Sequence, residues 1–181
     1  MATRIIAFDV ETPNHRNDRI CSIGIAIVDD GIIVDTRTFL VNPECEFDRR
    51  NIDVHGIHPE DVANAPTFDL VWNEISSLFR SNLVAAHNAM FDLSVLKKTL
   101  AAYGISESLL YFVCTMKIAQ KVLDNVGNYK LPTLCNYYTV RNTISASLST
   151  HTCAMHPCLV YARQSGDLTK GVVRHFASTP G

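Results

Sequence analysis

Two carboxylates at the end of an apolar run are the first residues whose types and spacing could do chemistry. Residues 4–10 read "RIIAFDV", and Asp9 and Glu11 close the run. In a strand, residues two apart face the same way, so both carboxylates project together from its carboxyl end. Like charges repel unless a cation lies between them, and hard oxygen ligands suit Mg²⁺ or Mn²⁺ rather than zinc. The pair is a candidate divalent-metal site.

A third acid follows a second apolar run. "LVAAHNAMFD" places Asp92 just after a short buried strand, and ligands of open α/β sheets lie outside the carboxyl ends of strands. Each acid alone has a structural interpretation, in which Asp9 caps a turn, Glu11 is solvated and Asp92 lies in the first turns of a helix. The combination favours three acids that converge on one cavity.

The elements that must position these acids begin with a meander. Residues 4–10 are apolar on both faces, as in a strand covered by helices on each side of a sheet. Residues 20–28 and 32–42 read as two further strands, joined at Asp29-Asp30-Gly31, where glycine supplies the positive φ of a tight hairpin. The first three strands are therefore expected to be adjacent.

Helices and strands then alternate. The segment "PEDVANAP" has acids in a possible first helical turn, and an apolar stripe at helical spacing runs from Phe68 to Phe79. Further strands are expected in "NLVAAHN" and "LLYFVCT", and helices in "MFDLSVLKKTLAAYG", "MKIAQKVL" and "LPTLCNYY". This order predicts an α/β fold, a mixed sheet with helices on both faces.

The bulk composition fits one ordinary domain of 181 residues. The net charge of −2 gives no electrostatic sign of a nucleic-acid partner, although an enzyme that meets phosphates through bound cations needs no basic surface. The six cysteines lie mostly in apolar runs without a secretory signal, which predicts reduced thiols in the cytoplasm. No apolar stretch is long enough to span a membrane, so we expect a soluble protein.

Three segments together carry a family resemblance. "FDVET", "VHGIHPEDV" and "HNAMFD" resemble the first motif, the substrate-side loop and the second motif of the DEDD 3′→5′ exonucleases, especially the DEDDh branch that contains the epsilon subunit of DNA polymerase III. The match keeps the family order over about residues 4–141. The resemblance implies an RNase H-like fold, with a five-stranded mixed sheet whose second strand is antiparallel.

The resemblance also implies roles for particular residues. Asp9, Glu11 and Asp92 match the ligands of two divalent ions, Mg²⁺ or Mn²⁺, and two such ions hold the attacking water and the leaving 3′ oxygen in an in-line hydrolysis. The matched positions that contact the terminal nucleotides are Thr12, Val54, His55 and Phe91.

Three of the motif side chains also have structural interpretations. The ring of Phe91 could stack on a base, or it could be a core aromatic. His87 is interpreted as a structural histidine rather than the general base, and Asn88 as a residue that fixes the local backbone.

The third motif of the histidine branch, H-x-x-x-x-D, is not found. Its histidine would be the general base and its aspartate the fourth metal ligand, but the expected positions hold Ser145 and Thr150. Three explanations stay open: true divergence of the tail, a shifted reading frame, or His151 acting as the base without the fourth acid. We therefore divide the chain into an exonuclease-like core, 1–142, and a divergent segment, 143–181.

The tail also contains "HTCAMHPC", whose histidines and cysteines have ligand-like spacing. Four ligands within eight residues can hardly form a tetrahedron, so a zinc site is not expected there.

The sequence predicts a metal-dependent exonuclease that hydrolyses single-stranded or frayed 3′ ends of DNA or RNA to nucleoside 5′-monophosphates, with a DNA polymerase as a possible partner. The alternative is a catalytically weak nucleic-acid-binding or polymerase-accessory module of the same fold.

Overall fold

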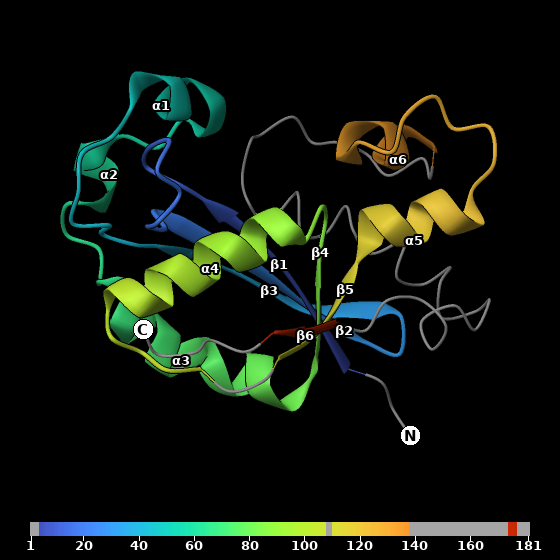
Figure 1. Cartoon of the computed structure of the whole chain (residues 1–181), viewed down its shortest axis with the longest axis horizontal. Helices are drawn as coiled ribbons and strands as arrows, with labels where there is room; N and C mark the ends of the chain where they lie inside the picture. Colours follow the sequence, from blue (N-terminus) through green and yellow to red (C-terminus); the bar gives the residue numbers. More distant parts are fainter. Residues whose placement is uncertain (1–3, 108–109, 138–173, 177–181) are drawn as a thin grey trace.

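A mixed β-sheet forms the centre of the molecule (Figure 1). The structure is a computed structural model that describes residues 4–107, 110–137 and 174–176. In spatial order the strands are β3 (Ile32–Leu40), β2 (Ser22–Asp29), β1 (Arg4–Glu11), β4 (Leu83–Ala86), β5 (Leu110–Cys114) and β6 (Arg174–Phe176).

The pairing of β1 defines the topology. This strand pairs antiparallel with β2 and parallel with β4, and β4 pairs parallel with β5. Strands β1 to β5 therefore form the mixed sheet that was expected, with its second strand antiparallel. The short strand β6 adds an antiparallel edge next to β5 and was not anticipated.

The hairpin between β2 and β3 has the predicted turn. Asp30 and Gly31 have φ angles of 50° and 83°, and positive φ at both central residues is the geometry that continues the twist of a two-residue hairpin. β2 is buried along nearly its whole length because it lies between β1 and β3 and is covered on both faces.

Six helices surround the sheet in the described part of the chain. Their bounds are α1 (Arg49–His55), α2 (Pro59–Val62), α3 (Phe68–Ser81), α4 (Met90–Ala102), α5 (Thr115–Val122) and α6 (Leu131–Tyr137). Helices α3 and α4 pack on the face that carries Phe8, and Ile118 of α5 packs on the face that carries Ala7. Helix α1 was not predicted, since "RRNIDVH" has no apolar stripe of its own.

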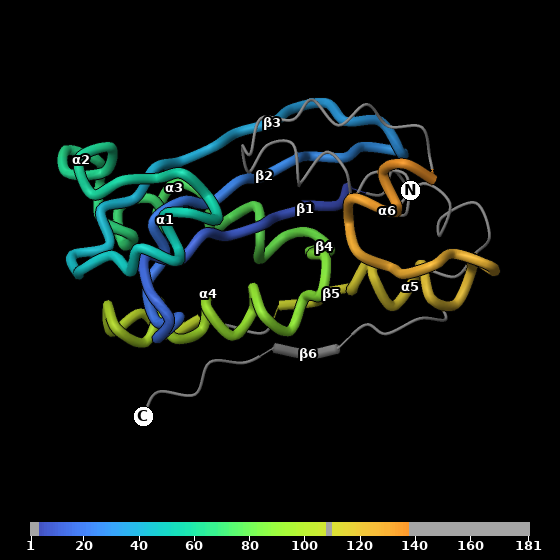
Figure 2. Tube along the Cα trace, turned by 90° about the horizontal axis from the view of Figure 1, so that it is seen from above, coloured from blue at the N-terminus to red at the C-terminus, as the bar shows by residue number. Residues whose placement is uncertain are grey.

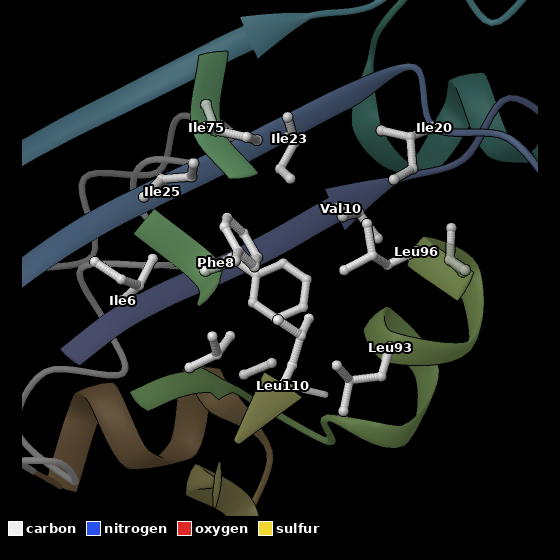
Figure 3. Close-up of a cluster of buried hydrophobic side chains, with 14 of the residues drawn as sticks. Ile6, Phe8, Val10, Ile20, Ile23, Ile25, Ile75, Leu93, Leu96 and Leu110 are labelled. Carbon is white, nitrogen blue, oxygen red and sulfur yellow. The ribbon is translucent and has the colours of Figure 1, made fainter. Parts of the chain in front are cut away.

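The main core confirms the predicted apolar stripe of α3. Phe68, Trp72 and Phe79 are each at most 1% exposed, and the ring of Phe79 meets Phe8 edge-on with 5.2 Å between centroids. Figure 3 shows Phe8 among side chains from β1, β2, α3 and α4. Both sides of β1 are thereby buried, and its carboxyl end has a fixed position.

Several sequence predictions lie outside the described residues. These are the third-motif positions Ser145 and Thr150, the candidate base His151 and the segment "HTCAMHPC". In the part that is described, no helix is long and apolar enough to cross a membrane. The cysteines described there, Cys21, Cys45, Cys114 and Cys135, are free thiols.

Candidate active site

The two motif aspartates lie against each other at the carboxyl end of β1. Asp92 is 2% exposed and accepts a hydrogen bond at Oδ1 from the backbone N–H of Val10, 3.3 Å away. Burial raises the pKa of Asp92 well above its usual range, and the charge of Asp9 and a hydrogen bond between the two side chains raise it further. Without a cation, burial and the neighbouring charge of Asp9 both favour the protonated form of Asp92.

The turn between β4 and α4 places Asp92 there. β4 runs parallel to β1, with Ala85 beside Ala7, so the chain leaves β4 next to the end of β1. Asn88 then adopts a φ of 57°, in the left-handed region that asparagine tolerates, and its carbonyl accepts the N–H of Phe91 at 3.0 Å. The backbone role expected for Asn88 is confirmed, and Asp92 falls in the first turn of α4.

Glu11 lies two residues after Asp9 on the same strand. It is half-buried at the end of β1 and lines a cavity beside the aspartates. Among the described residues, no group of three or more histidine, cysteine, aspartate or glutamate side chains is placed to hold a metal ion together. The structure brings Asp9 and Asp92 into contact and places Glu11 in the lining of the cavity.

That cavity has a volume of about 280 Å³, close to the lower limit of small-ligand pockets. All four residues expected on the substrate side, Thr12, Val54, His55 and Phe91, line it. The remaining lining residues are Val10, Glu11, Asn17, Arg50 and Asn51. Phe91 is 44% exposed, which rules out the core-aromatic interpretation.

Sequence reasoning missed Asn17, Arg50 and Asn51. Arg50 and Asn51 belong to α1, the helix that was not predicted. Asn17 has a positive φ of 52° in the loop that follows β1. A polar loop so close to two acids was the available signal for Asn17.

Hydrogen bonds from helix α1 hold the loop after β1 at Thr12. The Asn51 Nδ2 donates to the Thr12 carbonyl at 2.9 Å and lies 3.1 Å from Thr12 Oγ1. The Thr12 hydroxyl donates to Asn17 Oδ1 at 3.0 Å. The wall of the cavity is therefore a hydrogen-bonded unit rather than a free loop.

His55 completes this unit as a neutral imidazole. Its Nδ1 accepts the backbone N–H of Ile57 at 3.0 Å, so the proton sits on Nε2, which lies 3.2 Å from the Thr12 carbonyl and donates to it. Burial lowers the pKa of His55, in agreement with the neutral form.

The ring of His87 is occupied at both nitrogens. Nε2 lies 3.0 Å from the Tyr129 carbonyl and Nδ1 lies 3.0 Å from Thr115 Oγ1. Burial lowers the pKa of His87. These contacts join the end of β4 to the start of α5 and to the segment before α6, which is the structural role expected from the sequence.

Comparison with known proteins places this geometry in a family. The family model RNase_T, described as exonuclease, matches residues 6–152, a longer stretch than the motifs alone cover. The DNA polymerase III PolC-type protein of Caldanaerobacter subterraneus subsp. tengcongensis is 28% identical over 138 residues, which are 75% of this chain and 10% of that protein. The chain thus spans about a tenth of the length of this relative.

Solved structures share the fold. Exonuclease X in complex with 5′-overhanging duplex DNA superposes with a TM-score of 0.69 and 24% identity, covering 90% of this chain and 93% of that one. The nuclease domain of 3′hExo, a DEDDh family member bound to rAMP, gives a TM-score of 0.75 at 15% identity over 97% of both chains. The fold is RNase H-like, as expected, and the chain belongs to the DEDD family of exonucleases.

Proposed function

We propose that this chain is a metal-dependent 3′→5′ exonuclease that releases nucleoside 5′-monophosphates from single-stranded or frayed 3′ ends. The observation that carries the proposal is the contact between Asp9 and the buried Asp92 beside a cavity of about 280 Å³. Two carboxyl groups in contact, one of them buried, favour a cation between them.

The donor set fits a hard divalent cation. Asp9 and Asp92 offer carboxylate oxygens in contact with each other, and Glu11, at the end of the strand that carries Asp9, lines the cavity. Exonucleases of this family use divalent metals, and oxygen donors without thiol or imidazole partners match Mg²⁺ or Mn²⁺. When bound, two such ions would stabilise the charge on the attacking and leaving oxygens of a phosphodiester.

The chain's own residues would position the substrate. Phe91 exposes its ring at the mouth of the cavity, where an unstacked terminal base could pack on it. Thr12 is held by α1 and would present its backbone to the terminal nucleotide. Arg50, on the cavity wall, supplies positive charge for a phosphate.

The proton acceptor for the attacking water is assigned to His151. This is the explanation in which a histidine of the tail replaces the missing motif; the two histidines at the site itself do not offer a free base, because His87 is hydrogen-bonded at both nitrogens and His55 donates to a carbonyl. Loss of a general base typically costs about 10²–10⁴-fold in rate. Residues 143–181 are proposed as a divergent segment of the same domain. The cleavage rate of the unchanged chain measures how well this segment replaces the missing third motif.

The test is an exonuclease assay on a 5′-labelled oligonucleotide with and without Mg²⁺. Stepwise shortening from the 3′ end, release of 5′-monophosphates and loss of both in Asp9→Ala support the proposal. The matched control is Asp124→Asn, an exposed acid outside the site, which should cleave like the unchanged protein.

Binding of the oligonucleotide without shortening, unaltered by Asp9→Ala, would favour the alternative of a polymerase-accessory binding module. Internal cuts would contradict the exonuclease and point to a different phosphodiesterase activity on the same sheet.

A further inference from the structure

Strand β3 is an edge of the sheet and carries exposed apolar side chains. It pairs with β2 on one side, and Figure 2 shows it along the outer rim of the sheet. Ile32, Val34 and Leu40 are 67%, 54% and 40% exposed. A nine-residue edge strand with apolar side chains is a template for pairing with another strand.

The backbone of β3 has a defined outward side. Val41 N donates to the Cys21 carbonyl at 3.0 Å, just past the end of the ladder in which Leu40 lies opposite Ser22. Hydrogen-bonded and non-hydrogen-bonded pairs alternate in an antiparallel ladder. The N–H and C=O groups of Thr36 and Thr38 therefore point away from β2.

The sequence of β3 is complementary to itself about Thr36. If Thr36 lies opposite the partner's Thr36 in an antiparallel pair, Asp35 lies opposite the partner's Arg37, and Arg37 lies opposite the partner's Asp35. Within one strand, Arg37 Nε already donates to Asp35 Oδ2 at 2.8 Å, so both side chains extend on the same face of the sheet. A strand with charges of one sign would repel its copy, whereas this pair attracts it.

A bulge limits the length of this complementary segment. The register between β2 and β3 shifts between Ile27 and Val28, which leaves Val34 as the extra residue. The regular part of the edge therefore runs from Asp35 towards Leu40, and the two copies of Val34 would flank a short central ladder. A contact of this size belongs among the smaller specific interfaces.

We propose that two copies of this chain associate through β3, antiparallel about Thr36, so that one sheet continues across a two-fold axis. The contact is isologous, since each copy offers the same strand. No residue of β3 lines the cavity that Phe91 lines.

Charge reversal tests the partner directly. Sedimentation velocity over a concentration series should show a monomer–dimer equilibrium for the unchanged chain. Asp35→Arg and Arg37→Asp alone each place two like-charged pairs across the axis and should raise the dimer dissociation constant about tenfold or more. The equimolar mixture of these two variants has arginine at both positions in one chain and aspartate at both in the other, so association should return.

Thr36→Pro provides a second variant that keeps the fold. Proline is tolerated on an edge strand where the lost N–H faces outward, so this variant should melt like the unchanged chain and remain monomeric. Far-UV circular dichroism controls for folding in all variants. A chain that stays monomeric throughout the series, single reversals that associate like the unchanged chain, or a mixture that fails to associate would each overturn the proposal.

Discussion

Asp92 on α4 accepts the backbone N–H of Val10 on β1 at 3.3 Å, and this bond holds the carboxyl group of Asp92 beside Asp9. The bond satisfies one oxygen of a side chain that is 2% exposed. The largest influences on Asp92 are unfavourable for its charged form, because burial and Asp9 both raise its pKa. Under the proposed function, folding stability is given up at this pair for chemistry.

Asp92→Asn should abolish cleavage and stabilise the protein when no divalent metal is present. An amide keeps an acceptor for Val10 and offers Asp9 a permanent donor, without a charge that must be buried. Between pH 3.8, the ordinary pKa, and the raised value, the folded wild type binds more protons than the unfolded chain. Its stability therefore falls as the pH rises through that window, and the variant lacks this loss.

Thermal melts in a chelating buffer over this pH range measure the effect. We expect a gain of about 0.5–2 kcal/mol for the variant, growing with pH. A constant difference between the two proteins across the range would contradict the assignment of the raised pKa to Asp92.

Asn51→Ala should weaken substrate binding more than it slows cleavage. The substitution removes a donor that reaches both the carbonyl and the hydroxyl of Thr12, and it should cost about 1 kcal/mol of stability. Steady-state cleavage of an oligonucleotide should show a raised KM with a smaller change in kcat. The control is Asn73→Ala, which changes an exposed asparagine on α3. An equal effect of both substitutions on KM would contradict a role of Asn51 in substrate binding.

The Arg80–Glu107 pair should matter more to stability than the similar Arg4–Asp29 pair. Both arginines bind their carboxylate through two nitrogens at 2.6–3.0 Å. The side chain of Glu107 is 1% exposed and also accepts the indole N–H of Trp72, whereas the side chain of Asp29 is 31% exposed.

Removing Arg80 leaves a buried carboxylate with fewer partners, so Arg80→Ala should cost about 1–3 kcal/mol. Arg4→Ala should change the melting temperature little, because water replaces an exposed partner. Chemical denaturation of both variants gives the comparison, and equal losses would show that the burial of the carboxylate does not decide the cost.

The sequence was most informative where periodicity or turn chemistry decided the local structure. The two-sided apolar run of β1 and the stripe that ends at Phe79 follow from spacing, the Asp30-Gly31 turn follows from residue type, and each is present. Helix α1 could not be predicted in this way, because few of its side chains reach the core and its contacts to Thr12 are long-range. The contact of Asp92 with Asp9 likewise depends on the packing of α4 against β1, which strand alternation does not determine.

His55 should make stability depend on pH below neutrality. Its Nδ1 can accept the N–H of Ile57 only while unprotonated, and burial lowers its pKa below the ordinary 6.5. As the pH falls below 6.5, the unfolded chain therefore binds a proton more readily than the folded one, and stability falls. His55→Gln keeps a donor for the Thr12 carbonyl and removes the titration, so the variant should lose less stability between about pH 7.5 and about pH 5.5. Proton NMR of the wild-type protein measures the pKa of the His55 imidazole directly. A value at or above 6.5 would contradict the neutral imidazole and the fixed cavity wall that depends on it.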